Sequence, residues 1–204
     1  MITQRKLNFN DPAPDAEVVD ANGQRFQLST LWENQAVVLA FIRHFGCPQC
    51  KTMLEELREL QPELTKRHLS LVVVTQGKPA EALAFGEKYI PGVLLISDVE
   101  RDLYRLYGVR KGNLHATLFS LAVWRENNRA ARKGYRPEMP PKGQDVMQMS
   151  AVFIIASDGR IRLPYYYDHI ADPPPINLLL EGFLGMPWEK SFNGPIQPAG
   201  GSHE

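Results

Sequence analysis

The amino-acid sequence predicts a three-layer α/β sandwich, in which helices cover both faces of a mostly parallel sheet. Short apolar runs of strand length alternate with helical patterns through the first half of the chain. Two more strand-like segments, separated by a tight-turn sequence, follow between residues 151 and 167 and predict an antiparallel pair. Parallel strands that alternate with helices and then meet an antiparallel pair form such a layered sheet.

A β-hairpin is expected near the N-terminus, ahead of the sheet. Residues 16–20 and 24–28 have strand character, and Asn22-Gly23 between them supplies the positive φ of a tight turn.

Three continuous apolar runs predict the parallel strands. Runs of this length that are rich in branched residues favour central strands, which are buried on both faces. The three runs are Ala36–Ile42, Leu69–Thr75 and Val93–Ile96.

Helices are predicted after the first two of these strands. Apolar residues at helical spacing between Met53 and Leu64 predict the first helix, and Pro62 should kink it or end it near Gln61. The second helix should span Pro79–Tyr89.

A third helix is predicted from a capping-box pattern. Ser97 and Glu100 have the spacing at which side chain and backbone cap each other at a helix start. The helix that follows should bury Leu103, Leu106 and Tyr107.

Residues 108–147 break the alternation and are expected to form an insertion. Leu114–Arg132 has helical character, whereas 134–143 contains three prolines and should be a loop. Apolar and basic residues of the helix could lie on opposite faces. The simplest interpretation is a helix that packs on the domain; the alternatives are a partner surface, a lid over the cysteines or an interfacial membrane helix.

The regular structure should resume after the insertion. Ala151–Ile155 and Arg160–Tyr167 predict the antiparallel strands, and a last helix should run from the Pro173–Pro175 segment to Leu184. Residues 1–190 are therefore expected to form a single domain, and residues 191–204 a flexible tail.

Composition excludes several classes of protein. The 204 residues include 23 Lys plus Arg and 23 Asp plus Glu, so no overall charge favours binding to nucleic acid. The chain shows no signal-peptide pattern, and its apolar runs are too short to span a bilayer. We therefore expect a cytoplasmic protein, in which two cysteines are more often catalytic than structural.

Those two cysteines, Cys47 and Cys50, lie between a predicted strand and a predicted helix. In this context C-x-x-C is typical of a thioredoxin-like redox site. Pro48 suits the first helical position, which makes Cys47 the N-cap, and the helix dipole there lowers a thiol pKa. Cys47 is thus the expected nucleophile. Cys50, one turn later, is the expected resolving thiol that closes a disulfide with it.

Two basic side chains precede the nucleophile. Arg43 could lower the pKa of Cys47 further and bind a peroxide or disulfide, and His44 could donate a hydrogen bond or act as a general base. A surface charge and a polar turn residue are the alternatives for these two residues. Inert buried thiols are the alternative for the cysteines. A metal site would need two further ligands, and the histidines are scattered, so neither a metal nor a cofactor is expected.

The chain resembles the peroxiredoxin-like proteins of the AhpC/TSA group, with greatest similarity to the peroxiredoxin-like 2 branch. The resemblance rests on segments along most of the chain. They are Ala13–Gly23, Leu28–Trp32, Val37–Cys50, Gly108–Gly134, Phe153–Ile161 and Asp168–Pro174.

Two positions depart from that family. Peroxiredoxins place Thr or Ser three residues before the reactive cysteine, and Arg just before the late strand; here these positions hold His44 and Ser150. In the family those two residues hold the oxygens of the peroxide. Arg43 could substitute for them in part.

The resemblance implies a thioredoxin-like fold and an oxidoreductase. The expected activity is reduction of a hydroperoxide or a disulfide by the Cys47–Cys50 dithiol, with a thioredoxin or glutathione system as external reductant. The alternative is a redox-sensing or partner-binding module with little turnover. Relatives of this kind are commonly dimeric, so a homodimer is also expected.

Overall fold

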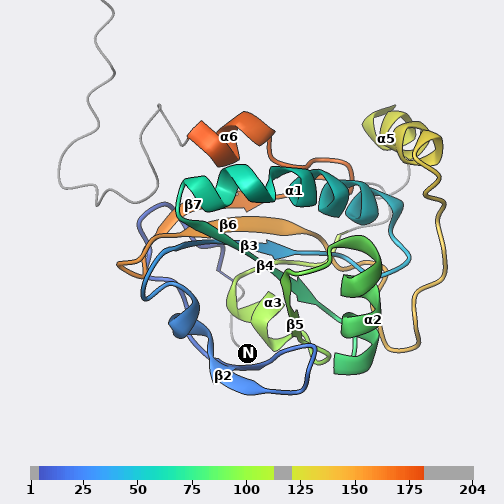
Figure 1. Ribbon diagram of the computed structural model, residues 1–204. Helices are drawn as coiled ribbons and strands as arrows, with labels where there is room; N and C mark the ends of the chain where they lie inside the picture. The colour runs from blue at the N-terminus through green and yellow to red at the C-terminus, as the bar shows by residue number, and fades with distance from the viewer. Residues whose placement is uncertain (1–4, 113–120, 182–204) are drawn as a thin grey trace, which may run out of the picture.

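A five-stranded sheet forms the centre of the computed structural model, which describes residues 5–112 and 121–181 (Figure 1). The strand order is β5-β4-β3-β6-β7. The strands are β3 (Ala36–Phe41), β4 (Leu69–Thr75), β5 (Leu94–Ser97), β6 (Ala151–Ile155) and β7 (Ile161–Tyr166). β3 pairs with β4 in parallel and with β6 in antiparallel orientation. The predicted parallel strands followed by an antiparallel pair are confirmed.

Helices and the hairpin cover the two faces of this sheet. On one face, side chains of the helices α1 (Pro48–Lys66), α2 (Pro79–Tyr89) and α6 (Ile176–Glu181) share a buried cluster with alternate residues of β3. On the other face lie the helices α3 (Asp102–Leu106) and η1 (Leu28–Leu31). The predicted three-layer class is therefore correct.

The predicted hairpin is present on that second face. It consists of β1 (Glu17–Val19) and β2 (Arg25–Gln27), which pair in antiparallel orientation. Gly23 in its turn has a φ of +82°, a conformation that glycine adopts without strain.

Central strand β3 explains why the sequence shows a continuous apolar run. Val37, Leu39 and Phe41 face one cluster, and Val38 and Ala40 face the other. Because both faces of the strand are covered, no position along it favours a polar side chain.

The sequence predicted that Pro62 would either kink helix α1 or end it near Gln61, and the second of these two predictions is wrong. It continues through Pro62 to Lys66. Leu64, in the turn after the proline, is fully buried, and the Thr65 hydroxyl donates to the Gln61 carbonyl at 2.9 Å. Burial of that last turn offsets the backbone hydrogen bond that proline cannot make.

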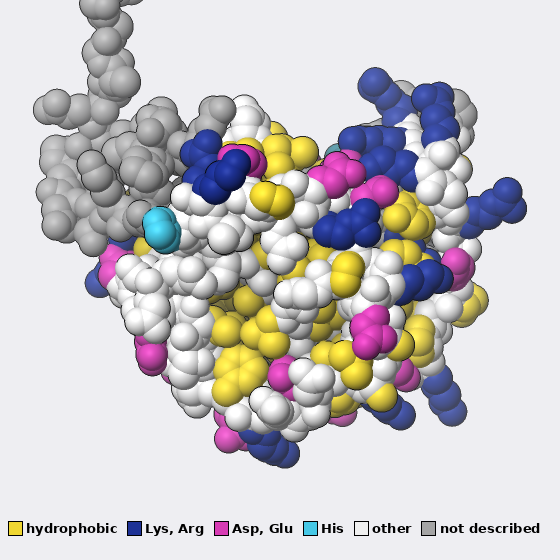
Figure 2. Space-filling view, viewed as in Figure 1, with side chains coloured by type: hydrophobic (Ala, Val, Ile, Leu, Met, Phe, Trp, Pro, Cys, Tyr) yellow, Lys and Arg dark blue, Asp and Glu magenta, His cyan; other side chains and the backbone are white. Residues whose placement is uncertain are grey.

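The insertion contains the expected helix in part. Helix α5 (Leu121–Arg132) is described, whereas residues 113–120 lie outside the described part of the chain. α5 lies beside α1, and Figure 2 shows Lys and Arg side chains gathered over it at the upper right. The end of the predicted last helix beyond residue 181, and the predicted tail 191–204, also lie outside the described residues.

Helix α3 begins differently from the expected capping box. The Ser97 hydroxyl donates to the carbonyl of Gly77, and the Asp98 carboxylate instead accepts from the backbone N–H groups of Asp102, Leu103 and Tyr104. One acidic side chain thus satisfies three N–H groups at the helix start, which a serine hydroxyl could not do.

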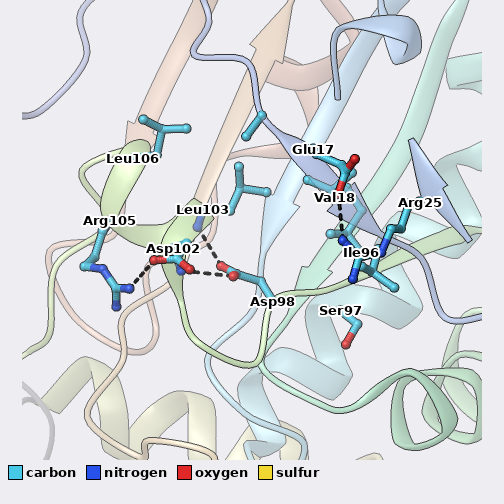
Figure 3. Close-up of a pocket in the computed structure, with 12 residues that line it drawn as sticks. Glu17, Val18, Arg25, Ile96, Ser97, Asp98, Asp102, Leu103, Arg105 and Leu106 are labelled. Atoms are coloured by element: carbon cyan, nitrogen blue, oxygen red, sulfur yellow. Dashed lines mark hydrogen bonds and ion pairs between the residues drawn. The ribbon is translucent and has the colours of Figure 1, made fainter. Parts of the chain in front are cut away.

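Leu103 and Tyr107 are buried as predicted, but Leu106 is 41% exposed. Leu106 is exposed because it lines a cleft of about 520 Å³ between β1 and α3 (Figure 3).

Within residues 5–112 and 121–181, no helix is long and apolar enough to cross a membrane.

Candidate functional site

The two cysteines lie at the junction of β3 and α1. β3 ends at Phe41, a short turn follows, and α1 begins at Pro48 with Cys47 as its N-cap. Cys47 has extended backbone angles (φ −80°, ψ 114°), and its sulfur accepts a hydrogen bond from the backbone N–H of Cys50 at 3.3 Å. The predicted N-cap position is confirmed: the sulfur receives an N–H group that has no partner inside the helix.

The two thiols differ in acidity although both are buried and reduced. Burial alone would raise the pKa of Cys47, but the hydrogen bond from the Cys50 thiol and the charge of Arg43 outweigh it and lower that pKa to about 6. Burial, together with its hydrogen bond to Cys47, raises the pKa of Cys50 well above the ordinary value. Near neutral pH the pair therefore carries one proton in total: Cys47 is a thiolate and Cys50 is a protonated thiol.

Arg43 is a buried cation that faces the sulfurs rather than solvent. Its Nη1 lies 3.8 Å from Sγ of Cys47, and its backbone N–H donates to Sγ of Cys50 at 3.4 Å. Two backbone carbonyls fix the guanidinium: Nε donates to Gln148 at 3.1 Å and Nη2 to Val146 at 2.5 Å. These two hydrogen bonds hold the guanidinium beside the Cys47 thiolate, so that it does not turn toward solvent.

His44 is buried next to this cation. Burial and the charge of Arg43 lower its pKa to about 4, rather than the near-neutral value expected of a general base. Its Nδ1 has no hydrogen-bond partner among the described residues. His44 is therefore a neutral imidazole at neutral pH: it carries no charge, and its ring can donate one hydrogen bond and accept another.

A loop that the sequence left without a role covers the site. We call residues 135–148 the strap. The backbone N–H of Glu138 donates to the carbonyl of Gly46 at 3.0 Å, and its carboxylate pairs with the buried Lys51 at 2.7 Å. A Cβ atom on Gly46 would lie 1.8 Å from the carbonyl oxygen of Glu138, so only glycine allows this approach.

Gln76 fastens the strap at its other end. The side chain of Gln76 is buried at the end of β4, and its amide donates to the carbonyls of Arg43 and Asp145. Its oxygen accepts from the N–H of Asp145 at 2.8 Å and from Arg101 at 3.3 Å. The strap carbonyls that hold Arg43 follow directly after Asp145, so Gln76 sets where they lie.

Gln76, Lys51 and the strap residues were missed at the sequence level. A signal existed for Gln76, because it follows a buried strand that is parallel to the strand before the cysteines. Residues at the carboxyl ends of neighbouring parallel strands meet at one edge of the sheet. No local pattern marks the strap, which lies about ninety residues further along the chain than the cysteines.

Access to the dithiol is restricted. Cys47 is 1% exposed and Cys50 3% exposed. A cavity of about 20 Å³ adjoins Cys50, and its wall also includes Gln49 and Ser150. Such a volume holds about one water molecule. Ser150, which the resemblance is expected to place where the family has Arg, thus lines the space beside Cys50.

The arrangement can carry out two-electron thiol chemistry. It holds one stabilised thiolate, one protonated thiol within reach of it and a cation that can stabilise a negatively charged oxygen or sulfur. Among the described residues, no group of three or more His, Cys, Asp or Glu could hold a metal ion.

Comparison with known proteins gives a consistent match along the chain. The sequence model of the AhpC/TSA family matches residues 9–163. A prostamide/prostaglandin F synthase of Danio rerio is 24% identical over 156 residues, which cover 76% of this chain and 77% of that protein. Peroxiredoxin-like 2C of Mus musculus is 26% identical over 112 residues, which cover 54% of this chain and half of that protein.

Solved structures have the same fold. A peroxiredoxin-like protein from Aquifex aeolicus superposes with a TM-score of 0.62 at 19% identity, over 86% of this chain and 85% of that one. Peroxidoxin BcpB from Mycobacterium tuberculosis superposes with a TM-score of 0.60 at 20% identity, over 81% and 90%.

Proposed function

Because the chain belongs to the AhpC/TSA family and is thus a thiol-dependent oxidoreductase, we propose that Cys47 reduces a hydroperoxide and Cys50 resolves the product. The unequal acidity of the two thiols carries this proposal. A cysteine that attacks a peroxide must be a thiolate near neutral pH. A resolving cysteine can stay protonated until the first cysteine has been oxidised.

The proposed reaction has three steps. The Cys47 thiolate attacks the terminal oxygen of the hydroperoxide, the O–O bond breaks, and the leaving oxygen takes a proton and departs as an alcohol or water. The Cys50 sulfur then attacks the sulfenic acid on Cys47, which releases water and forms the Cys47–Cys50 disulfide. An external dithiol, of the thioredoxin or glutathione type, reduces the disulfide and is itself oxidised.

Arg43 and His44 have distinct parts in this proposal. Arg43 stabilises the Cys47 thiolate and the negative charge that develops on the departing oxygen. His44, being neutral, can donate a hydrogen bond to that oxygen or accept one from the peroxide.

The same dithiol can also reduce a disulfide, because C-x-x-C at a helix start suits exchange with an external disulfide.

A redox-sensing module is the second candidate. The burial of both cysteines favours it, since a protein reductant must reach a sulfur to complete a catalytic cycle. In that case the Cys47–Cys50 disulfide would alter binding of a partner without steady turnover. The homodimer and the cytoplasmic location expected from the sequence stay predictions.

Single-cysteine variants test the assigned roles. After treatment with one equivalent of hydrogen peroxide, mass spectrometry should find a disulfide in the wild type and a sulfenic acid on Cys47 in Cys50→Ser. Cys47→Ser should stay reduced and inactive. If Cys50 is the thiol that is oxidised in Cys47→Ser, at the wild-type rate, the roles are reversed and the proposal is wrong.

A further inference from the structure

The strap contacts the turn that leads into Cys47. The backbone N–H of Glu138 donates to the Gly46 carbonyl at 3.0 Å, and Oε1 of Gln144 accepts from the backbone N–H of Phe45 at 2.9 Å. Both cysteines of the dithiol are buried behind this turn. A dithiol reductant, which must reach a sulfur atom, therefore needs a part of these surroundings to move.

Arg43, in the same turn, joins the strap to the charge on the dithiol. It is 5% exposed, and among the described residues no carboxylate pairs with its guanidinium. Its Nη1 faces Sγ of Cys47 at 3.8 Å, so the Cys47 thiolate is the anion beside this cation. The rest of the guanidinium is held by the strap carbonyls of Val146 and Gln148, which carry no net charge.

The neighbouring ionisable groups give the guanidinium no second anion. Lys51, a buried cation of α1, pairs with Glu138 at 2.7 Å, and Asp145 pairs with Lys111 at 2.6 Å. His44 is neutral at neutral pH. Within the described part of the chain, loss of the thiolate thus leaves a buried guanidinium without a counter-charge.

We infer that formation of the Cys47–Cys50 disulfide releases the strap from the turn, an inference that rests on the proposed function. The Cys47 thiolate, the Cys50 thiol, a hydroperoxide and one proton give the disulfide, an alcohol and water, as two electrons pass from sulfur to oxygen. The negative charge beside Arg43 is lost in this reaction. A buried charge that has lost its partner is strongly unfavourable. The guanidinium reaches water by leaving the strap carbonyls, and the strap then loses its link to Arg43.

This release would occur at the step that needs it. The strap stays closed while Cys47 is a thiolate and loosens once the disulfide has to meet an external dithiol. Helix α1 does not need to unwind, because the backbone N–H of Cys50 already lies 3.3 Å from Sγ of Cys47.

The size of the effect follows from reciprocal coupling. A cation beside a thiolate favours the ionised form by about ten- to a hundredfold. The thiolate must favour the inward position of the cation by the same factor, because coupling between two sites is reciprocal. We therefore expect oxidation to raise the equilibrium constant for strap release by about ten- to a hundredfold.

The test is amide hydrogen exchange of the reduced and the oxidised protein at neutral pH, measured by mass spectrometry. Diamide forms the disulfide without peroxide, so the measurement does not depend on the peroxidase function. The N–H groups of Glu138 and Asp145 report release, because they donate to Gly46 and to the side chain of Gln76. Strand β4 is the internal control and should exchange equally in both states.

Four variants separate charge from disulfide formation. Cys47→Ser has neither a thiolate nor a disulfide, and its strap should exchange as fast as that of the oxidised wild type. Cys50→Ser keeps the thiolate and should exchange as slowly as the reduced wild type. Arg43→Met should show the same strap exchange before and after oxidation. Arg105→Met, at an exposed arginine of α3, is the matched control and should keep the full response.

The results for the strap and for peroxide are independent. Equal strap exchange in the reduced and oxidised wild type overturns the inference, as does slow exchange in Cys47→Ser or a full response in Arg43→Met. Each of these results leaves the peroxidase function standing. If the strap responds to diamide but Cys47 reacts with hydrogen peroxide no faster than free cysteine, the proposed function is contradicted while the release of the strap holds.

Discussion

Replacing Arg43 by Met should raise the pKa of Cys47 and slow its reactions at slightly acidic pH. The Arg43 guanidinium lies 3.8 Å from Sγ of Cys47. Two unit charges at about this distance attract by about 4 kcal/mol at an effective dielectric constant of 20. The guanidinium charge is delocalised and also serves two carbonyls, so we expect a smaller effect, a rise of about 1 to 2 pKa units.

The effect on rate follows from the fraction of thiolate. With a pKa of about 6, Cys47 is about three quarters thiolate at pH 6.5. With a pKa of about 7.5 it would be about one tenth thiolate, so alkylation should slow about eightfold at that pH. Above about pH 9 the variant and the wild type should converge, because both are then fully ionised.

The assay is the pH dependence of Cys47 alkylation by iodoacetamide, measured by mass spectrometry from pH 4.5 to about 9.5. Arg43→Lys keeps the charge and should show a smaller shift. Arg105→Met, a change to an exposed arginine of α3, should have no effect. A midpoint in Arg43→Met equal to that of wild type would refute the reasoning, because Arg43 would then contribute nothing to the thiolate.

Three further changes probe the surroundings of the dithiol. Gln76→Leu should raise the Cys47 pKa by about 1 unit through misplacement of Arg43, whereas a merely structural role would lower the melting temperature and leave the alkylation midpoint unchanged. Gly46→Ala should drive Glu138 away, detach the strap and destabilise the fold by about 1 to 3 kcal/mol in urea titration; wild-type stability would show that the strap is not held there. The pKa of His44 is lowered on folding, so its contribution to stability is complete above the unfolded value of about 6.5 and is lost as pH falls toward about 4. His44→Gln should therefore reduce the loss of stability between those pH values by up to about 3 kcal/mol, and an unchanged pH dependence would contradict the buried neutral imidazole.

The fold was predictable because its central elements carry local signals. The apolar run of β3, the C-x-x-C motif and the periodic α1 are adjacent in the sequence, so the strand–cysteine–helix unit follows from short-range rules. Pro62 shows where such short-range rules fail. Locally, a proline favours the end of a helix, but in the folded protein the burial of Leu64 outweighs that preference.

The electrostatics of the site were predictable only in outline. The sequence places a cation before Cys47, but not whether the side chain of Arg43 turns inward. That orientation depends on carbonyls of Val146 and Gln148, and these depend on the contact of Gln76 with Asp145. Contacts between residues about a hundred positions apart leave no periodic or spacing signal in a single sequence.

The most direct test of the account is the rate at which hydrogen peroxide oxidises Cys47 in the reduced protein. Stopped-flow measurement at pH 7 with the Cys50→Ser variant and with wild type isolates this step. We predict a second-order rate constant at least about a hundredfold above that of free cysteine, because the site supplies both a thiolate and a cation for the departing oxygen. A rate equal to that of free cysteine would contradict a peroxidase and leave only disulfide exchange or redox sensing for the Cys47–Cys50 pair.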